Sequence, residues 1–275
     1  MRLTPLFLLV ALGLCATAVA ELAPTPPPGQ RKGGLDETYH ALVAANDTAG
    51  LIELWKANEG RVLGTLDRDL EGSLALWEAA QGEEGSDEVA LDDETRAKIA
   101  EMHARATMGA KAASEAFGRP IFQDYAASFL SWDAADKRNF RAGQAAFGEA
   151  MQAMREPEGA GLERAKEEGE RCSQLALPLG DWWGYAMGLG ASGRAKLGLG
   201  DLEGALGDLS RARLFDQALG LTRSELGDLD GMLACLEGIE RWSRAKGVLD
   251  VLVERTEGEV RSAYEARLEA VTGKL

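Results

Sequence analysis

The chain has 275 residues with 45 acidic and 30 basic side chains, which gives a formal net charge of −15 at pH 7. This length is ample for a hydrophobic core, and a negative charge of that size repels phosphate groups. We therefore expect no nucleic-acid partner and no docking on anionic lipid.

Residues 1–20 are typical of an export signal. A basic residue precedes an apolar run over 6–14, and Ala18 and Ala20 supply the small residues of a cleavage site. Cleavage near Ala20 predicts a periplasmic or secreted mature protein. A lipid anchor at Cys15 is the alternative, although the residue before it is not small. No other apolar run approaches the ~18 residues of a membrane span, so we expect none in the mature chain.

Residues 21–34 are rich in proline and glycine, so we expect a disordered tether there. The rest of the chain holds three prolines and no long alternating β-branched runs, which favours an all-α fold. Residues 35–131 are predicted to form an N-terminal helical region. It begins with two short helices, at 35–45 and 48–58, separated by an Asn-Asp turn.

Two longer helices are predicted in the same region. Apolar residues at three- and four-residue spacing place one stripe on 60–81 and another on 92–117, where Asp92 can cap the start. The acidic segment 82–91 between them is expected to be a solvated loop. The acidic residues of 67–78 also match positions of an EF-hand calcium loop. The apolar stripe continues through this segment, so we favour a plain helix.

A repeated segment characterises residues 132–275. The sequence LGDWWGYAMGLG from Leu179 aligns without a gap on LGDLDGMLACLE from Leu226, a period of 47 residues. Each period contains two helical patterns, which is typical of an α-solenoid. We expect the last helix, over 248–273, to be a polar cap.

Small and apolar residues recur where the two helices of a unit would touch, at Gly193, Ala195, Gly200, Ala205, Leu209 and Ala212. This pattern resembles the long-helix variety of the tetratricopeptide-repeat (TPR) family over about residues 158–247. The resemblance implies a right-handed α-solenoid of antiparallel helix pairs that binds proteins or peptides. It has departures, because Ser192, Lys196 and Gln217 stand where the family has leucine, tyrosine and proline.

Three arginines are candidate partner-binding residues. Arg194 and Arg241 align at the same repeat position, which the resemblance places on a concave groove, and Arg244 follows three residues later. A guanidinium matches a carboxylate, so the groove is predicted to take an acidic peptide or a chain terminus. Ion pairs with neighbouring acidic residues are the alternative.

Trp182 and Trp183 are further candidates, together with Tyr185. Adjacent residues on a helix point about 100° apart, so we expect one tryptophan in the core and the other partly exposed. An exposed ring is suited to anchor a peptide or a glycan. Packing of all three rings against the preceding helix is the alternative.

Other motifs are weaker signs of chemistry. Gly188, Gly190 and Gly193 spell G-x-G-x-x-G, but the residues that follow have helical periodicity, so we expect a helix crossing and no nucleotide site. His40 and His103 lack other ligands at zinc spacing, so we expect no metal site, and His103 is predicted to be a surface residue.

The predicted function is that of an exported scaffold for a protein or peptide partner. The candidate residues form no catalytic constellation, so we expect neither an enzyme nor a cofactor. Cys172 and Cys235 are expected to be buried as small apolar residues, with one disulfide as the alternative. The alternative function is a cell-envelope protein that holds a glycan or peptide on Trp182, Trp183 and Tyr185.

Overall fold

The computed structural model of the chain describes residues 32–80 and 91–275, and all their regular elements are helices. The all-α prediction is therefore confirmed for this part of the chain. The predicted signal peptide, most of the predicted tether and nearly all of the acidic loop over 82–91 lie outside the described residues. In the described ranges, none of the helices has the length and apolar character needed to cross a bilayer.

The N-terminal helices match the predicted pattern closely. A left-handed residue, Asn46 (φ 53°), ends the first, and the Asp47 carboxylate accepts the Gly50 amide at 2.9 Å at the start of the second. Asp92 caps the fourth helix in the same way, accepting the Thr95 amide at 2.7 Å. These helices are α2 (Lys32–Ala44), α3 (Thr48–Lys56), α4 (Val62–Ala80), α5 (Asp93–Phe117) and α6 (Ile121–Ser131), with a 3-10 turn η1 (Glu59–Arg61) before α4.

Helix α4 runs without a break through the segment that imitates a calcium loop. Its Asp69 bonds Arg105 of α5 at 2.6 Å, and Glu71 and Glu78 each bond one arginine of the next part of the chain, Arg141, at 2.7 Å. These carboxylates therefore join helices, as a plain helical surface predicts.

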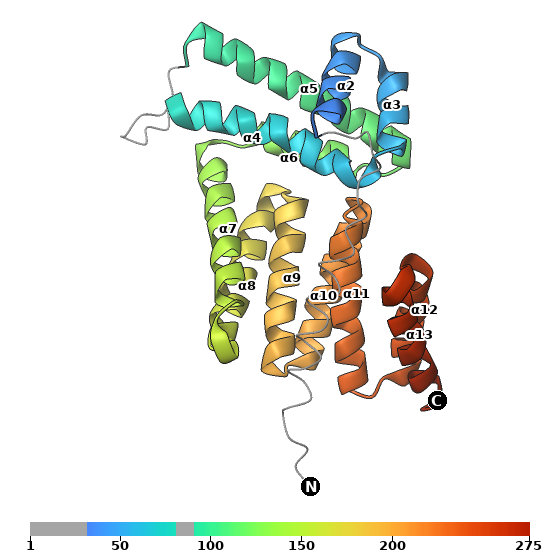
Figure 1. Ribbon diagram of the computed structural model, residues 1–275. Coiled ribbons are helices and arrows are strands. Elements are labelled where there is room, and N and C mark those ends of the chain that lie inside the picture. The colour runs from blue at the N-terminus through green and yellow to red at the C-terminus, as the bar shows by residue number, and fades with distance from the viewer. Residues whose placement is uncertain (1–31, 81–90) are drawn as a thin grey trace.

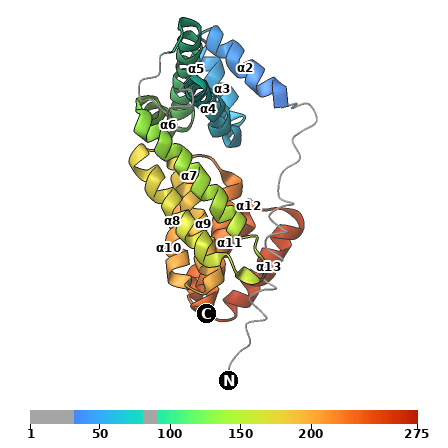
Figure 2. The same ribbon diagram turned by 90° about the vertical axis from the view of Figure 1, so that its left-hand side faces the viewer.

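The remaining helices follow one another in space as they do in sequence. In Figure 1, α7 to α11 stand side by side, and α4, α5 and α6 lie across one end of them. Figure 2 shows the same division from the side. The helices are α7 (Ala134–Ala153), α8 (Leu162–Leu179), α9 (Trp182–Leu199), α10 (Leu202–Ala218), α11 (Thr222–Gly238), α12 (Trp242–Arg255) and α13 (Gly258–Thr272), with a 3-10 turn η2 (Pro157–Gly159) before α8.

Helices α8 to α12 begin 20 residues apart, and equivalent turns join them. Each turn contains a left-handed residue: Gly180, Gly200, Gly220 and Glu240, with φ of 66°, 84°, 72° and 58°. In each turn, two successive backbone N–H groups bond carbonyls of the preceding helix, which is the pattern of a Schellman cap. The structural unit is therefore one helix with its turn.

The predicted 47-residue register is wrong. Leu179 to Asp181 forms the turn between α8 and α9, whereas the aligned Leu226 to Asp228 lies inside α11. Asp181 caps α9 by accepting the Gly184 amide at 2.9 Å. The same tripeptide serves the second time as helix interior, because the left-handed turn has already occurred at Gly220.

The predicted capping helix over 248–273 is also incorrect in its bounds. The chain is extended at Thr256 (φ −119°, ψ 163°) and Glu257 (φ −134°, ψ 168°), which separates α12 from α13. The buried Thr256 side chain donates to the Leu252 carbonyl at 2.6 Å and so closes α12.

Glycines allow α8 and α9 to approach each other closely. A β-carbon on Gly169 would lie 2.6 Å from the Ser192 amide nitrogen, and one on Gly188 would lie 2.5 Å from that of Ser173. Gly188, Gly190 and Gly193 all belong to α9, which begins at Trp182, so no strand precedes them as a nucleotide site requires. The helix-crossing interpretation is confirmed for Gly188 and Gly193, which meet α8 and α10, whereas a β-carbon on Gly190 would meet only Arg194 of α9 itself.

Candidate functional site

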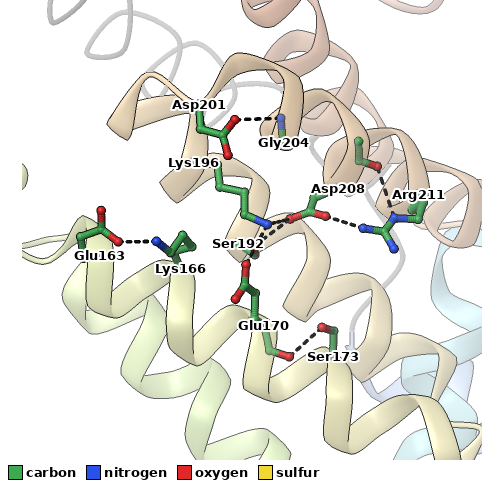
Figure 3. Close-up of polar contacts among 11 residues, drawn as sticks. Glu163, Lys166, Glu170, Ser173, Ser192, Lys196, Asp201, Gly204, Asp208 and Arg211 are labelled. Carbon is green, nitrogen blue, oxygen red and sulfur yellow. Dashed lines mark hydrogen bonds and ion pairs between the residues drawn. The ribbon is translucent and has the colours of Figure 1, made fainter.

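An open cleft lies over α9, between α8 and α10, with a volume of about 280 Å³. We call it the α9 cleft. Its walls combine apolar side chains with charged ones, as the close-up in Figure 3 shows for the polar part. The lining residues are Glu170, Ser173, Gln174, Leu177, Tyr185, Leu189, Lys196, Asp208 and Arg211.

A bonded network fixes the charged side of the α9 cleft (Figure 3). Lys196 donates to Asp208 at 2.7 Å and bonds Glu170 at 2.8 Å. Asp208 also accepts from the Ser192 hydroxyl at 2.8 Å and from Arg211 at 2.6 Å. The buried Asp208 carboxylate is thus compensated by two cations and a hydroxyl, as burial of a charge requires.

The other side of the α9 cleft is apolar. Leu177 is 48% exposed, whereas Leu189, which lines the same cleft, is buried. The Arg211 side chain is 55% exposed. One terminal nitrogen donates to Asp208 at 2.6 Å and Nε donates to the Gly207 carbonyl at 3.4 Å, which leaves N–H groups of the terminal nitrogens for a ligand. The α9 cleft can therefore hold an apolar group beside a carboxylate.

The structure divides the predicted aromatic cluster. Trp182 stacks on Phe215 of α10 with ring centroids 5.6 Å apart, and Tyr185 meets the same ring edge-on at 5.1 Å. Trp183 instead lines a separate cavity beside Asp67 of α4. Both tryptophans are half-buried, so the expectation of one partly exposed ring holds, whereas the expectation that the other lies fully in the core is wrong. Glycan or peptide binding by these rings stays a prediction.

The predicted arginines do not occupy equivalent positions. Arg194 lies within α9 and bonds the buried Asp228 of α11 at 2.9 Å, with 43% of its side chain exposed. Arg241 precedes the first residue of α12, and Arg244 lies in the first turn of that helix, both exposed. The ion-pair alternative holds for Arg194. Partner binding by the three arginines stays a prediction.

Two buried carboxylates, Asp216 of α10 and Asp228 of α11, lie near enough to influence each other's protonation. Burial and the neighbouring Asp228 raise the pKa of Asp216. Burial also raises the pKa of Asp228, against the opposing charge of Arg194. The pair therefore retains a proton above the ordinary carboxyl range.

A second cavity, of about 140 Å³, lies where the N-terminal helices meet the array. We call it the junction cavity. Burial is the main cause that raises the pKa of its two acids, to about 6 for Asp67 and about 7 for Asp181. Sequence reasoning missed it, because only tertiary packing brings these two residues together. The lining residues are Asp67, Tyr125, Phe140, Gln144, Asp181, Trp183, Gly184 and Met187.

The histidines and cysteines have separate outcomes. His40 is exposed. His103 is half-buried, with Nε2 2.9 Å from the Ser73 hydroxyl, so its assignment to the open surface is wrong. Cys172 and Cys235 are buried free thiols, which confirms the apolar interpretation. Within the described ranges, no three side chains of metal-ligating type are grouped as a metal site.

Comparison with known proteins gives no match: no protein-family model, no curated protein and no solved structure matches the chain. The resemblance to TPR proteins is therefore supported only at a coarser level. The described helices pack against their neighbours in chain order, which is compatible with a helical repeat.

Proposed function

We propose that this chain is an exported, non-catalytic scaffold that binds a protein or peptide on a right-handed α-solenoid of antiparallel, TPR-like helix pairs. The α9 cleft is the observation that carries the proposal. It places the exposed Leu177 beside the partly free donors of Arg211, on helices whose spacing is regular.

The shape and chemistry of the α9 cleft favour a peptide segment. An apolar side chain of the partner packs on Leu177, Leu189 and Tyr185, and a carboxylate next to it bonds Arg211. Because Lys196 and Asp208 are already bonded to each other at 2.7 Å, these side chains lose little conformational entropy when a peptide binds. The volume of about 280 Å³ suits one or two partner side chains, with the surrounding helix surfaces adding contact area.

The test begins with selection from a displayed peptide library on the mature chain, followed by affinity measurement on the selected peptides. We expect them to carry an apolar residue beside an acidic one. Leu177→Glu is expected to weaken their binding at least about tenfold, because it places a charge in an apolar contact. Leu199→Glu is the matched control, since Leu199 is 39% exposed at the end of α9 and does not line the cleft.

A second arm tests the carboxylate contact. Arg211→Gln is expected to weaken the binding of peptides that carry the acidic residue. It should leave unchanged the binding of the same peptides with that carboxylate replaced by an amide. Equal binding by the Leu177 and Leu199 variants, with both shown to be folded by thermal melts, would exclude the α9 cleft as the binding surface.

Export is tested separately. The proposal expects the protein in the periplasm or medium with Glu21 as its first residue, because the segment before it combines an apolar run with small residues at Ala18 and Ala20. Ala20→Arg is expected to block cleavage. A chain that keeps Met1 and stays in the cytoplasm would contradict this part of the proposal.

A further inference from the structure

Two carboxylates from distant parts of the chain converge on the junction cavity. Asp67 comes from α4 and Asp181 precedes α9, and the Asp181 residue is only 5% exposed. The Tyr125 hydroxyl donates to Asp67 at 2.9 Å, and the Gly184 amide donates to Asp181 at 2.9 Å. Both donors are neutral. They satisfy hydrogen-bonding capacity without supplying positive charge.

The nearby basic residues are bonded elsewhere. Arg141 binds Glu71 and Glu78 at 2.7 Å each, and Arg68 binds Asp36. Within residues 32–80 and 91–275, no basic side chain forms an ion pair with Asp67 or Asp181. Arg141 and Arg68 act on Asp67 only from beyond ion-pair distance. Burial disfavours the charged form of both carboxylates, so a cation that enters the cavity stabilises that form.

The other walls select the kind of cation. Trp183 and the buried Phe140 contribute aromatic rings, and Met187 contributes a polarizable thioether. The exposed Gln144 also lines the cavity, which places an opening to solvent there. The volume of about 140 Å³ corresponds to the liquid volume of about four or five waters, enough for an ammonium on a short alkyl chain.

We propose that the junction cavity binds an alkylammonium group, with Asp181 and Asp67 as its counter-ions and Trp183 packed against its alkyl chain. The group is either a small free amine or the lysine side chain of a partner. This site uses none of the residues of the α9 cleft, so either proposal can fail without the other.

The experiment titrates the mature chain at pH 8 with butylammonium chloride and, as a neutral control, with 1-pentanol. Tryptophan emission and the melting temperature are measured. We expect the amine to change emission saturably and to raise the melting temperature, with no such effect of the alcohol. An N-acetyl-lysine amide is titrated in parallel. Tighter binding of butylammonium identifies a free amine, and tighter binding of the lysine derivative identifies a partner side chain.

A matched pair of variants tests the counter-ion. Asp181→Asn removes the charge and keeps an oxygen that can accept the Gly184 amide, so α9 remains capped. We expect it to weaken amine binding at least about tenfold. The control is Asp201→Asn, which changes the equivalent but exposed cap of α10, where the Gly204 amide is 3.0 Å away. It is expected to bind like the unchanged protein.

The pH dependence gives an independent readout. Burial raises the pKa of Asp67 to about 6 and of Asp181 to about 7. The other titratable or charged groups near them are Glu71, Arg68, Arg141 and Tyr125. Amine binding is expected to strengthen from pH 5 to 8, as the two acids ionise and the amine stays protonated. Asp181→Asn is expected to weaken this trend.

Three results would overturn the proposal. The first is an absence of saturable, amine-specific binding. The second is equal affinity of the Asp181→Asn and Asp201→Asn variants. The third is displacement of the amine by millimolar calcium chloride, if this displacement depends on Asp181. That result would identify the cavity as a metal-ion site.

Discussion

Gly169 of α8 lies so close to Ser192 of α9 that a β-carbon on Gly169 would be 2.6 Å from the Ser192 amide nitrogen. Gly169→Ala must therefore push two backbones apart. We expect it to lower the free energy of unfolding by about 1–3 kcal/mol, as overpacking does in other cores. Urea denaturation followed by circular dichroism measures the change.

The control for Gly169 is Gly207, an exposed glycine within α10 that has no atom within 4 Å of the position a β-carbon would take. Gly207→Ala is expected to stabilise the protein by up to about 1 kcal/mol, because alanine favours the helix without a clash. If both substitutions stabilise to the same degree, the helices do not touch at Gly169.

Glu240 occupies a left-handed position that glycine holds in the other turns of the array, with φ 58°. Glu240→Gly should raise the free energy of unfolding by about 1 kcal/mol, because the left-handed conformation is strained for residues with a β-carbon. Gly200→Ala is the reverse test, since φ is 84° there and no atom lies within 4 Å. It is expected to cost about 1 kcal/mol. Unchanged melting temperatures in both variants would contradict the turn geometry.

Asp216 makes stability depend on pH. Burial and the carboxylate of Asp228 raise the pKa of Asp216, so the folded chain keeps a proton that the unfolded chain has lost. The contribution is favourable below about pH 4 and is lost as the pH rises through the raised pKa, with a slope of at most about 1.4 kcal/mol per pH unit. Asp216→Asn should reduce this decline in urea melts from pH 5 to 9. Asp250→Asn, an exposed carboxylate of α12, should leave the profile unchanged.

Cys172 and Cys235 should react slowly in the folded protein. Both are buried free thiols, and burial raises their pKa values to about 12 and about 11. Since the thiolate is the reactive form, a thiol reagent at pH 8 should label them only after denaturation. Rapid labelling of both residues without denaturant would show that α8 and α11 open readily.

Helix positions were predictable because their signals are local. The apolar stripe of α4 and the Asp92 cap of α5 depend on residues a few positions apart, and both appear as expected. The register of the repeat was not predictable, because the sequence Leu-Gly-Asp fits both a turn and a helix interior. Position 181 caps α9, whereas position 228 bonds Arg194 inside the array. The spacing of Gly180, Gly200 and Gly220 was the better guide.

The junction cavity was beyond the reach of sequence patterns for a different reason. The sequence around Asp67 is that of an exposed position on a helix, and the sequence around Asp181 is that of a helix N-cap. Only the packing of α4 and α6 against the start of α9 turns both carboxylates toward one space. The division of Trp182 from Trp183 follows from the same packing, since α10 covers one ring and the junction receives the other.

The constant length of the units between Leu162 and Trp242 restricts how a gene for this chain can change in size. Loss of one codon within a helix would rotate every later side chain by about 100° and bring polar groups into the core. Duplication or loss of two whole units would leave all downstream contacts in phase. Viable length variants should therefore differ by complete units of 20 residues.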